Sequence, residues 1–93
     1  MPYKLLYHPA VPKKDLPGIP ADWKERIRHV IEKRLTADPV LAGRPLRQSL
    51  KGHRKLRIGD WRVIYRISGQ DVIILKIGHR REVYRRAAER GGK

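Results

Sequence analysis

The sequence predicts an α+β fold, in which a helical hairpin packs on one face of a mostly antiparallel, four-stranded sheet and a short helix ends the chain. Two observations predict this fold. Two alternating runs in the last third of the chain are joined by Gly59-Asp60, which is typical of a β-hairpin, and a third apolar run follows them. Upstream, apolar residues recur at helical spacing between residues 20 and 37. Because 93 residues suffice for one compact core, we expect a single domain over residues 1–93.

The elements before the hairpin follow from local patterns. Alternation over residues 3–8 predicts a first strand, which His8-Pro9 ends, and residues 10–16 are compatible with a short helix. Residues 20–37 predict a longer helix, and its apolar stripe consists of Trp23, Ile27, Val30, Ile31 and Leu35. Residues 40–50 contain Gly43 and Pro45 and predict a loop, whereas residues 82–90 predict the short final helix.

The Gly59-Asp60 turn fixes the register of the hairpin. It pairs Ile58 with Trp61, Arg57 with Arg62, Leu56 with Val63, and Lys55 with Ile64. Side chains alternate along each strand, so one face carries Leu56, Ile58, Trp61, Val63, Tyr65 and Ile67. The opposite face carries His53, Lys55, Arg57, Arg62, Ile64 and Arg66. A slip of one residue would place Arg62 and Arg66 in the core, so this register is the favoured one.

The third run, residues 72–77, is expected to continue both faces. Its Ile73, Leu75 and Ile77 suit the apolar face, and Lys76, followed by Arg80, suits the basic face. We expect the long helix to cover the apolar face. The basic face would then be open to solvent or partly covered by the final helix.

The charge indicates a polyanionic partner. The formal net charge is +14, and residues 51–93 contain 13 Lys or Arg against 4 Asp or Glu. Such a field attracts nucleic acid, an anionic membrane or an acidic protein. The chain has no cysteine, which excludes disulfides, thiol nucleophiles and Cys-based zinc sites, and four scattered histidines predict no metal site. No apolar run approaches the ~20 residues that span a bilayer, so we expect a cytoplasmic protein without a membrane partner.

Several blocks together resemble the RelE/ParE superfamily, the toxins of bacterial toxin–antitoxin pairs. They are the opening strand with His8-Pro9, Pro45-Leu46 with Leu50 and Gly52, the block from Lys55 to Tyr65, and Gly78-His79-Arg80 with Glu82-Val83-Tyr84. The resemblance implies a RelE-like fold and a cognate antitoxin, which we expect to be acidic and partly disordered. In the RelE branch it implies an endoribonuclease without cofactor or metal. Such a toxin enters the ribosomal A site and cleaves mRNA by attack of a ribose 2′-OH on the adjacent phosphate.

The resemblance also implies catalytic residues, which are Lys55, Arg62, Arg80 and Tyr84. The sequence departs from the best-studied members at His53 and His79, where those members carry lysine, and in a shorter segment between Arg80 and Tyr84.

Each of these residues has a chemical role and a plainer alternative. Lys55 is the candidate general base, since the cations Arg57 and Arg62 nearby favour its neutral amine, and His53 on the same face could share that role. The alternative is a solvated strand lysine. Arg62 and Arg80 can fork onto phosphate oxygens or merely grip RNA.

Tyr84 can stack on a base or orient the 2′-OH, or it can simply pack the final helix on the sheet. The remaining basic-face residues are expected to bind RNA as an electrostatic cradle; they are His53, Arg57, Arg66, Lys76 and Arg81, with Arg85 and Arg86.

Two other functions stay open at this point. One is a ParE-like inhibitor of DNA gyrase on the same fold, and the other is a non-catalytic nucleic-acid-binding module. The simultaneous presence of Lys55, Arg62, Arg80 and Tyr84 favours the ribonuclease. A non-catalytic module predicts that Lys55 and Arg80 can each be removed with a modest, additive loss of affinity.

Overall fold

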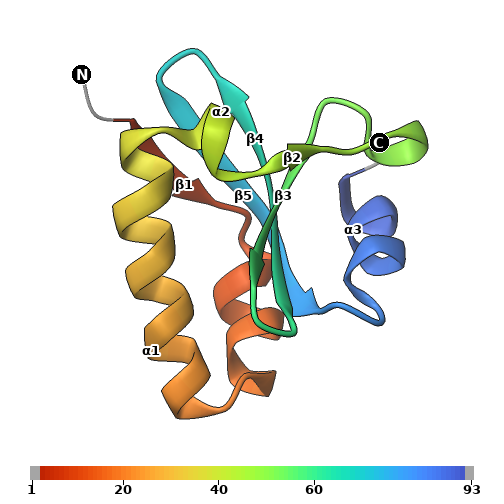
Figure 1. Cartoon of the computed structure of the whole chain (residues 1–93). Coiled ribbons are helices and arrows are strands. Elements are labelled where there is room, and N and C mark those ends of the chain that lie inside the picture. Colours follow the sequence, from red (N-terminus) through yellow and green to blue (C-terminus); the bar gives the residue numbers. More distant parts are fainter. Residues whose placement is uncertain (1–2, 92–93) are drawn as a thin grey trace.

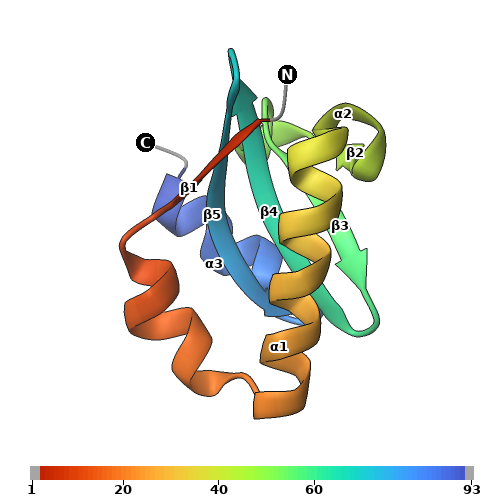
Figure 2. The same cartoon turned by 90° about the vertical axis from the view of Figure 1, so that its left-hand side faces the viewer.

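The computed structural model describes residues 3–91 as a three-layered α+β fold, with a helical hairpin on one face of a sheet and a short helix on the other (Figures 1 and 2). The strands are β1 (Lys4–Tyr7), β2 (Arg44–Pro45), β3 (Arg54–Ile58), β4 (Trp61–Ser68) and β5 (Asp71–His79). The α-helices are α1 (Ala21–Val30), α2 (Pro39–Ala42) and α3 (Val83–Gly91). Shorter or irregular helical segments are η1 (Val11–Asp15), η2 (Leu16–Gly18), η3 (Ile31–Leu35), which continues α1, and η4 (Gln48–Leu50). This arrangement confirms the predicted fold class.

The sheet has the order β1-β5-β4-β3-β2. Only β1 is parallel to its neighbour, β5, and the other pairs are antiparallel. The β3–β4 register is the predicted one, with Arg57 opposite Arg62 and Lys55 opposite Ile64. Gly59 begins the turn at a φ of 61°, a conformation that glycine adopts without strain.

The sheet contains five strands rather than the expected four, because β2 lies in the segment predicted as a loop. Its two residues pair Arg44 with Lys55 and Pro45 with Arg54. A strand this short leaves no alternation to detect, and the flanking Gly43 and the proline are both typical of loops. β2 shields only the first part of β3, so the rest of that edge is open.

A β-bulge in β5 changes which of its side chains point to each face of the sheet. Ile64 pairs with Lys76, but the next residue of β4, Tyr65, pairs with Ile74, so Leu75 is an extra residue on β5. As a result Val72 and Ile74 join Ile77 in the core beneath α1, and Leu75 packs on the opposite face. The expectation for Ile77 is confirmed, whereas those for Ile73 and Leu75 are wrong.

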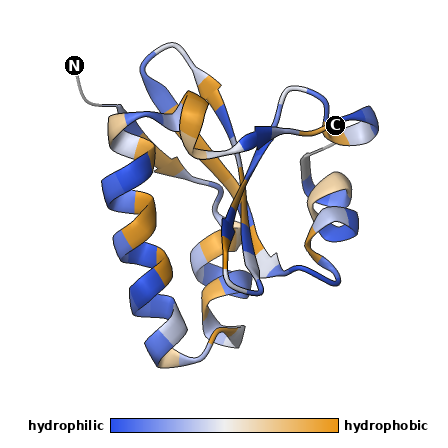
Figure 3. Ribbon diagram, viewed as in Figure 1, coloured by the Kyte–Doolittle hydropathy of each residue, from blue (hydrophilic) through white to orange (hydrophobic). Residues whose placement is uncertain are grey.

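The two faces of the sheet bury two apolar clusters of different size. Beneath α1 and η3 the predicted stripe packs on the sheet, with Ile27, Ile31 and Leu35 almost fully buried (Figure 3). The second cluster consists of Leu50, Ile64, Leu75, Val83 and Ala87, and α3 covers it. Of the two arrangements expected for the basic face, open to solvent or partly covered by the final helix, the structure has the second, and α3 packs there on an apolar part of the face.

Candidate active site

A basic hollow of about 400 Å³ lies where β2 ends and the edge of β3 becomes open. Its lining residues lie on or next to η3, α2, β2, β3, β4 and α3; they are Arg34, Ala42, Gly43, Arg44, Lys55, Leu56, Arg57, Arg62 and Tyr84. Three of the four predicted catalytic residues, Lys55, Arg62 and Tyr84, thus meet in one hollow. Five lining residues are cationic and none is acidic, which makes the hollow suited to a phosphate group.

Lys55 and Tyr84 both line this hollow and lie close to each other. Lys55 lies on β3 and is half-buried, and its Nζ is 5.6 Å from the centroid of the Tyr84 ring. A cation over an aromatic face at this separation is attracted by the ring quadrupole. The two residues are brought together by the packing of α3 on the sheet.

Arg62 is oriented by the hairpin turn. Its Nη1 donates to the carbonyl oxygens of Gly59, at 2.8 Å, and of Trp61, at 3.0 Å. A guanidinium has five N–H donors in a planar fork, so the hydrogen bonds made by Nη1 leave donors on Nε and Nη2 for an anion. Across the strands Arg57 is directly opposite Arg62, which doubles the positive charge at this end of the hollow.

Arg80 does not line the hollow but lies at the same hairpin turn. Its backbone N–H donates to the Asp60 carbonyl at 2.9 Å, and its Nε is 3.6 Å from the Asp60 carboxylate. About half of each side chain is exposed, so this ion pair is weak and easily exchanged for a pair with phosphate.

His53 is adjacent to the hollow and differs from Lys55 in its surroundings. Burial and the positive charge of Arg66 hold the pKa of the His53 imidazole below its ordinary value of 6.5, against a smaller opposing effect of the Leu50 carbonyl. Its Nδ1 is buried and has no hydrogen-bond partner within residues 3–91. The imidazole is therefore neutral at pH 7, but it does not line the hollow.

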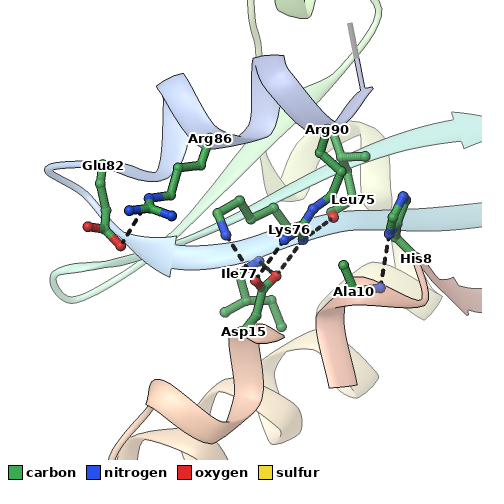
Figure 4. Close-up of polar contacts among 9 residues, drawn as sticks. All are labelled: His8, Ala10, Asp15, Leu75, Lys76, Ile77, Glu82, Arg86 and Arg90. Atoms are coloured by element: carbon green, nitrogen blue, oxygen red, sulfur yellow. Dashed lines mark hydrogen bonds and ion pairs between the residues drawn. The ribbon is translucent and has the colours of Figure 1, made fainter. Parts of the chain in front are cut away.

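Lys76 corrects the expected RNA-binding set. It lies on the predicted face of the sheet, but its side chain is 8% exposed and its Nζ donates to Asp15 at 2.9 Å (Figure 4). The η1 segment and α3 cover it, and sequence alternation cannot show that cover. The arginines predicted to bind RNA are all exposed; they are Arg57, Arg66 and Arg81, with Arg85 and Arg86.

Two cations of the hollow, Arg34 and Arg44, were not predicted from sequence. Arg34 is on the polar side of the α1–η3 helix, and Arg44 is on the strand that was expected to be a loop. Only the pairing of β2 with β3 brings Arg44 next to Lys55, so no local signal identifies it.

Gly43, which also lines the hollow, is surrounded by a network of hydrogen bonds. Arg54 Nη2 donates to the carbonyls of Val40, at 2.6 Å, and Gly43, at 3.0 Å. The buried Tyr65 hydroxyl donates to the Pro39 carbonyl at 2.6 Å. A side chain at Gly43 would overlap the Lys55 carbonyl and the Tyr65 hydroxyl, so only glycine allows this approach.

Tyr84 also lines a second, less polar hollow of about 500 Å³ between η4 and α3. Leu46, Leu50 and Ala88 contribute apolar surface there, and the charged lining residues are Arg47, Arg85 and Glu89. The Tyr84 ring therefore borders both a phosphate-sized basic hollow and a surface on which a flat base can rest.

Residues 3–91 contain no group of three or more His, Cys, Asp or Glu side chains arranged to hold a metal ion. Within the same residues, no helix is long and apolar enough to cross a membrane.

Comparison with solved structures defines the class of protein. The toxin–antitoxin complex RelBE2 from Mycobacterium tuberculosis matches with a TM-score of 0.79 and 28% identity, over 85% of this chain and 99% of that chain. A free-state mutant of the E. coli toxin RelE matches with a TM-score of 0.76 over 98% of this chain and 99% of that chain, but at 18% identity this match shows the fold alone. The fold is that of the RelE-type toxins.

The sequence shows the family. Residues 5–84 match the family described as "ParE toxin of type II toxin-antitoxin system, parDE". The chain is also 41% identical over 54 residues to Toxin RelG of Mycobacterium tuberculosis. The matched segment covers 56% of this chain and 62% of that protein. The chain belongs to the ParE toxin family and is a type II toxin of the RelE/ParE superfamily, as the sequence motifs indicated.

Proposed function

We propose that this toxin is a ribosome-dependent endoribonuclease that cleaves mRNA in the ribosomal A site. The observation that carries the proposal is the meeting of Lys55, Arg62 and Tyr84 in one basic hollow without a carboxylate. A phosphodiester brought into this hollow would have its charge neutralised from several sides, which is what the crowded, doubly charged phosphorane needs.

The proposed reaction assigns one role to each residue. The Lys55 amine acts as the general base and accepts the proton of the 2′-OH, whose oxygen forms a bond to the adjacent phosphorus. Arg62 and Arg80 donate to the non-bridging oxygens, and the bond from phosphorus to the 5′-oxygen breaks. The leaving 5′-oxygen takes a proton from water, so the products are a 2′,3′-cyclic phosphate and a free 5′-OH, and Lys55 returns its proton to solvent. No step requires a metal ion.

The absence of acidic residues and of His53 from the lining of the hollow supports the proposed dependence on the ribosome. Neither Asp60, in the hairpin turn, nor Glu82, before α3, lines it, and His53 lies outside it. A site without a conventional acid–base pair gains most from a substrate that is already ordered, and the ribosome supplies that order for the mRNA. Tyr84 would stack on a base next to the scissile phosphate.

The partner that we propose is an acidic antitoxin, which would neutralise the basic hollow and its exposed arginines. Support comes from the charge of +14 and from RelBE2 and the Methanococcus jannaschii RelB–RelE assembly, both toxin–antitoxin complexes on this fold. A partly disordered acidic segment can follow such a surface and order on binding.

The test is primer extension on a defined mRNA held in purified 70S ribosomes. Wild-type protein should produce cuts confined to the A-site codon, and Lys55→Ala and Arg80→Ala should each reduce the rate by about 10²–10³. Lys13→Ala is the matched control, since Lys13 is exposed on η1 and does not line the hollow. Cleavage retained in Lys55→Ala and Arg80→Ala would refute the assigned roles.

Inhibition of DNA gyrase is the second candidate, and the match to the ParE family favours it. A supercoiling assay with purified gyrase distinguishes the two. Inhibition of supercoiling, together with the absence of cuts on ribosomes, would replace the ribonuclease proposal.

A further inference from the structure

A buried carboxylate joins three segments, η1, β5 and α3, at the β5 side of the sheet, whereas the hollow lies toward β2 and β3. Asp15, the last residue of η1, has a side chain only 1% exposed. It accepts hydrogen bonds from Lys76 Nζ at 2.9 Å, from the Ile77 backbone N–H at 2.9 Å, and from Arg90 at 2.8 and 3.1 Å (Figure 4). One carboxylate thus binds the backbone and a buried lysine of β5 and an arginine of α3.

The position of Asp15 is explained by the edge of β5. β1 pairs only with Asp71 to Ile74, so the following part of that edge has no neighbouring strand. The Ile77 N–H is directed to this gap, and a buried N–H without an acceptor is costly. The chain turns from β1 into η1 along the same edge, and Asp15 provides the acceptor that a longer strand would have provided.

Arg90 attaches the far end of α3 to this carboxylate. Its two terminal nitrogens bind both Asp15 oxygens as a fork, and Nη1 also donates to the Leu75 carbonyl at 3.0 Å. The rest of the α3 contact consists of the buried Val83 and Ala87 and the partly buried Tyr84 and Ala88. A helix of nine residues is not stable by itself in water, so its place on the sheet depends on these contacts.

The same helix carries Tyr84 in its first turn, with the ring 5.6 Å from Lys55 Nζ. We propose that Asp15 and Arg90 are positioning residues, which hold α3 against β5 so that Tyr84 stays over Lys55. The catalytic consequence rests on the proposed function, whereas the docking of α3 does not.

The charge state of Asp15 agrees with this arrangement. Burial would raise the pKa of its carboxyl, but the hydrogen bonds from Arg90, Ile77 N–H and Lys76 lower the pKa by more, so the net pKa is below the ordinary value of 3.8. The carboxylate is therefore charged at neutral pH.

The experiment is hydrogen–deuterium exchange on the full chain carrying Arg90→Met, which leaves the Asp15–Lys76 pair in place. We expect α3 amides to exchange about 10²-fold faster while β4 and β5 amides stay protected. Arg90→Lys, which keeps a charge but loses the fork, should restore part of the protection. Glu82→Gln is the matched control, because it removes only the exposed Glu82–Arg86 pair at 3.9 Å, also shown in Figure 4.

Unchanged α3 exchange in Arg90→Met, with circular dichroism equal to wild type, would overturn the proposal. If Arg90→Met were to unfold the whole chain, the Arg90→Lys variant would test the proposal instead. Protection of the α3 amides in Arg90→Lys equal to that in wild type would show that the two-nitrogen contact with Asp15 is not needed, and would overturn the proposal.

The second readout is the ribosomal cleavage rate in a double-mutant cycle with Tyr84→Ala. If Arg90 acts through Tyr84, Arg90→Met should slow cleavage about 10-fold or more in the wild-type background and not at all in the Tyr84→Ala background. Equal losses in both backgrounds would overturn the link to Tyr84. If wild-type protein makes no cuts, the proposed function fails, and the exchange data still decide the docking of α3.

Discussion

Replacing Gly43 with alanine places a methyl group where the structure has no space. The added Cβ would overlap the Lys55 carbonyl oxygen and the Tyr65 hydroxyl, and neither is the free end of a flexible side chain. The backbone at Gly43 is extended, with a φ of −129°, so any residue can adopt it and the whole effect is steric. The 38–43 segment must therefore move away from β3 and β4.

The size of the effect follows from the bonds that this movement stretches. They are the Tyr65–Pro39 bond and the two bonds from Arg54 to the carbonyls of Val40 and Gly43. Overpacking by one methyl costs about 1–3 kcal/mol, and each weakened hydrogen bond adds roughly 0.5–1 kcal/mol. We expect the free energy of unfolding to fall by about 3 kcal/mol.

Urea denaturation of Gly43→Ala measures this change, and Gly18→Ala is the matched control. No atom lies within 4 Å of a Cβ built at Gly18, so that variant should be neutral, or more stable by about 0.5 kcal/mol through its less flexible unfolded chain. If the two variants differed by less than about 1 kcal/mol, the proposed packing of Gly43 on β3 would be refuted. Because Gly43 also lines the hollow beside Lys55, Gly43→Ala should slow mRNA cleavage as well.

Four further predictions concern charge. The pKa of Asp15 is depressed in the folded protein, so its stabilising effect is complete above about pH 4 and is lost as the pH falls through the folded-state pKa. In acid titrations followed by circular dichroism, the stabilities of wild type and Asp15→Asn should therefore converge at low pH. His53 also has a depressed pKa, so protonation destabilises the fold as the pH falls below 6.5, and His53→Gln should remove this loss from urea titrations between pH 5 and 7. The double variant Lys55→Ala/Arg80→Ala should lose toxicity in cells but keep its circular dichroism spectrum, since neither side chain is in the core; unfolding would contradict the assigned faces. Ribosome binding by filter assay should weaken steeply with added salt, and a flat response would exclude the basic surface as the docking face.

The hairpin shows how far sequence reasoning reaches. Its alternation, its turn at Gly59-Asp60 and the penalty for burying Arg62 and Arg66 all favour the same register, and the structure has that register. The stripe of the long helix was equally readable, because each of its contacts repeats at a fixed spacing along one element. Both patterns are local, and the hairpin and the long helix each have one strongly apolar face.

The bulge at Leu75 could not be read in this way. An extra residue on β5 leaves the composition of the run unchanged while it moves every preceding side chain to the other face. The burial of Lys76 could not be predicted either. Alternation showed which face of the sheet it lies on, but its burial depends on Asp15, which is 61 residues away.

The sequence by itself determined the fold class, the core of α1 and the hairpin, the excess of positive charge and the family of this toxin. Only the tertiary structure decided which cations share the hollow with Lys55 and which are buried in ion pairs. Arg34 and Arg44 reach the hollow through the packing of η3 and the pairing of β2, and Arg90 is withdrawn from the surface by a carboxylate 75 residues away. The physical reason is that a buried charge is tolerated only beside its partner, and partners so distant in sequence meet only when the chain has folded.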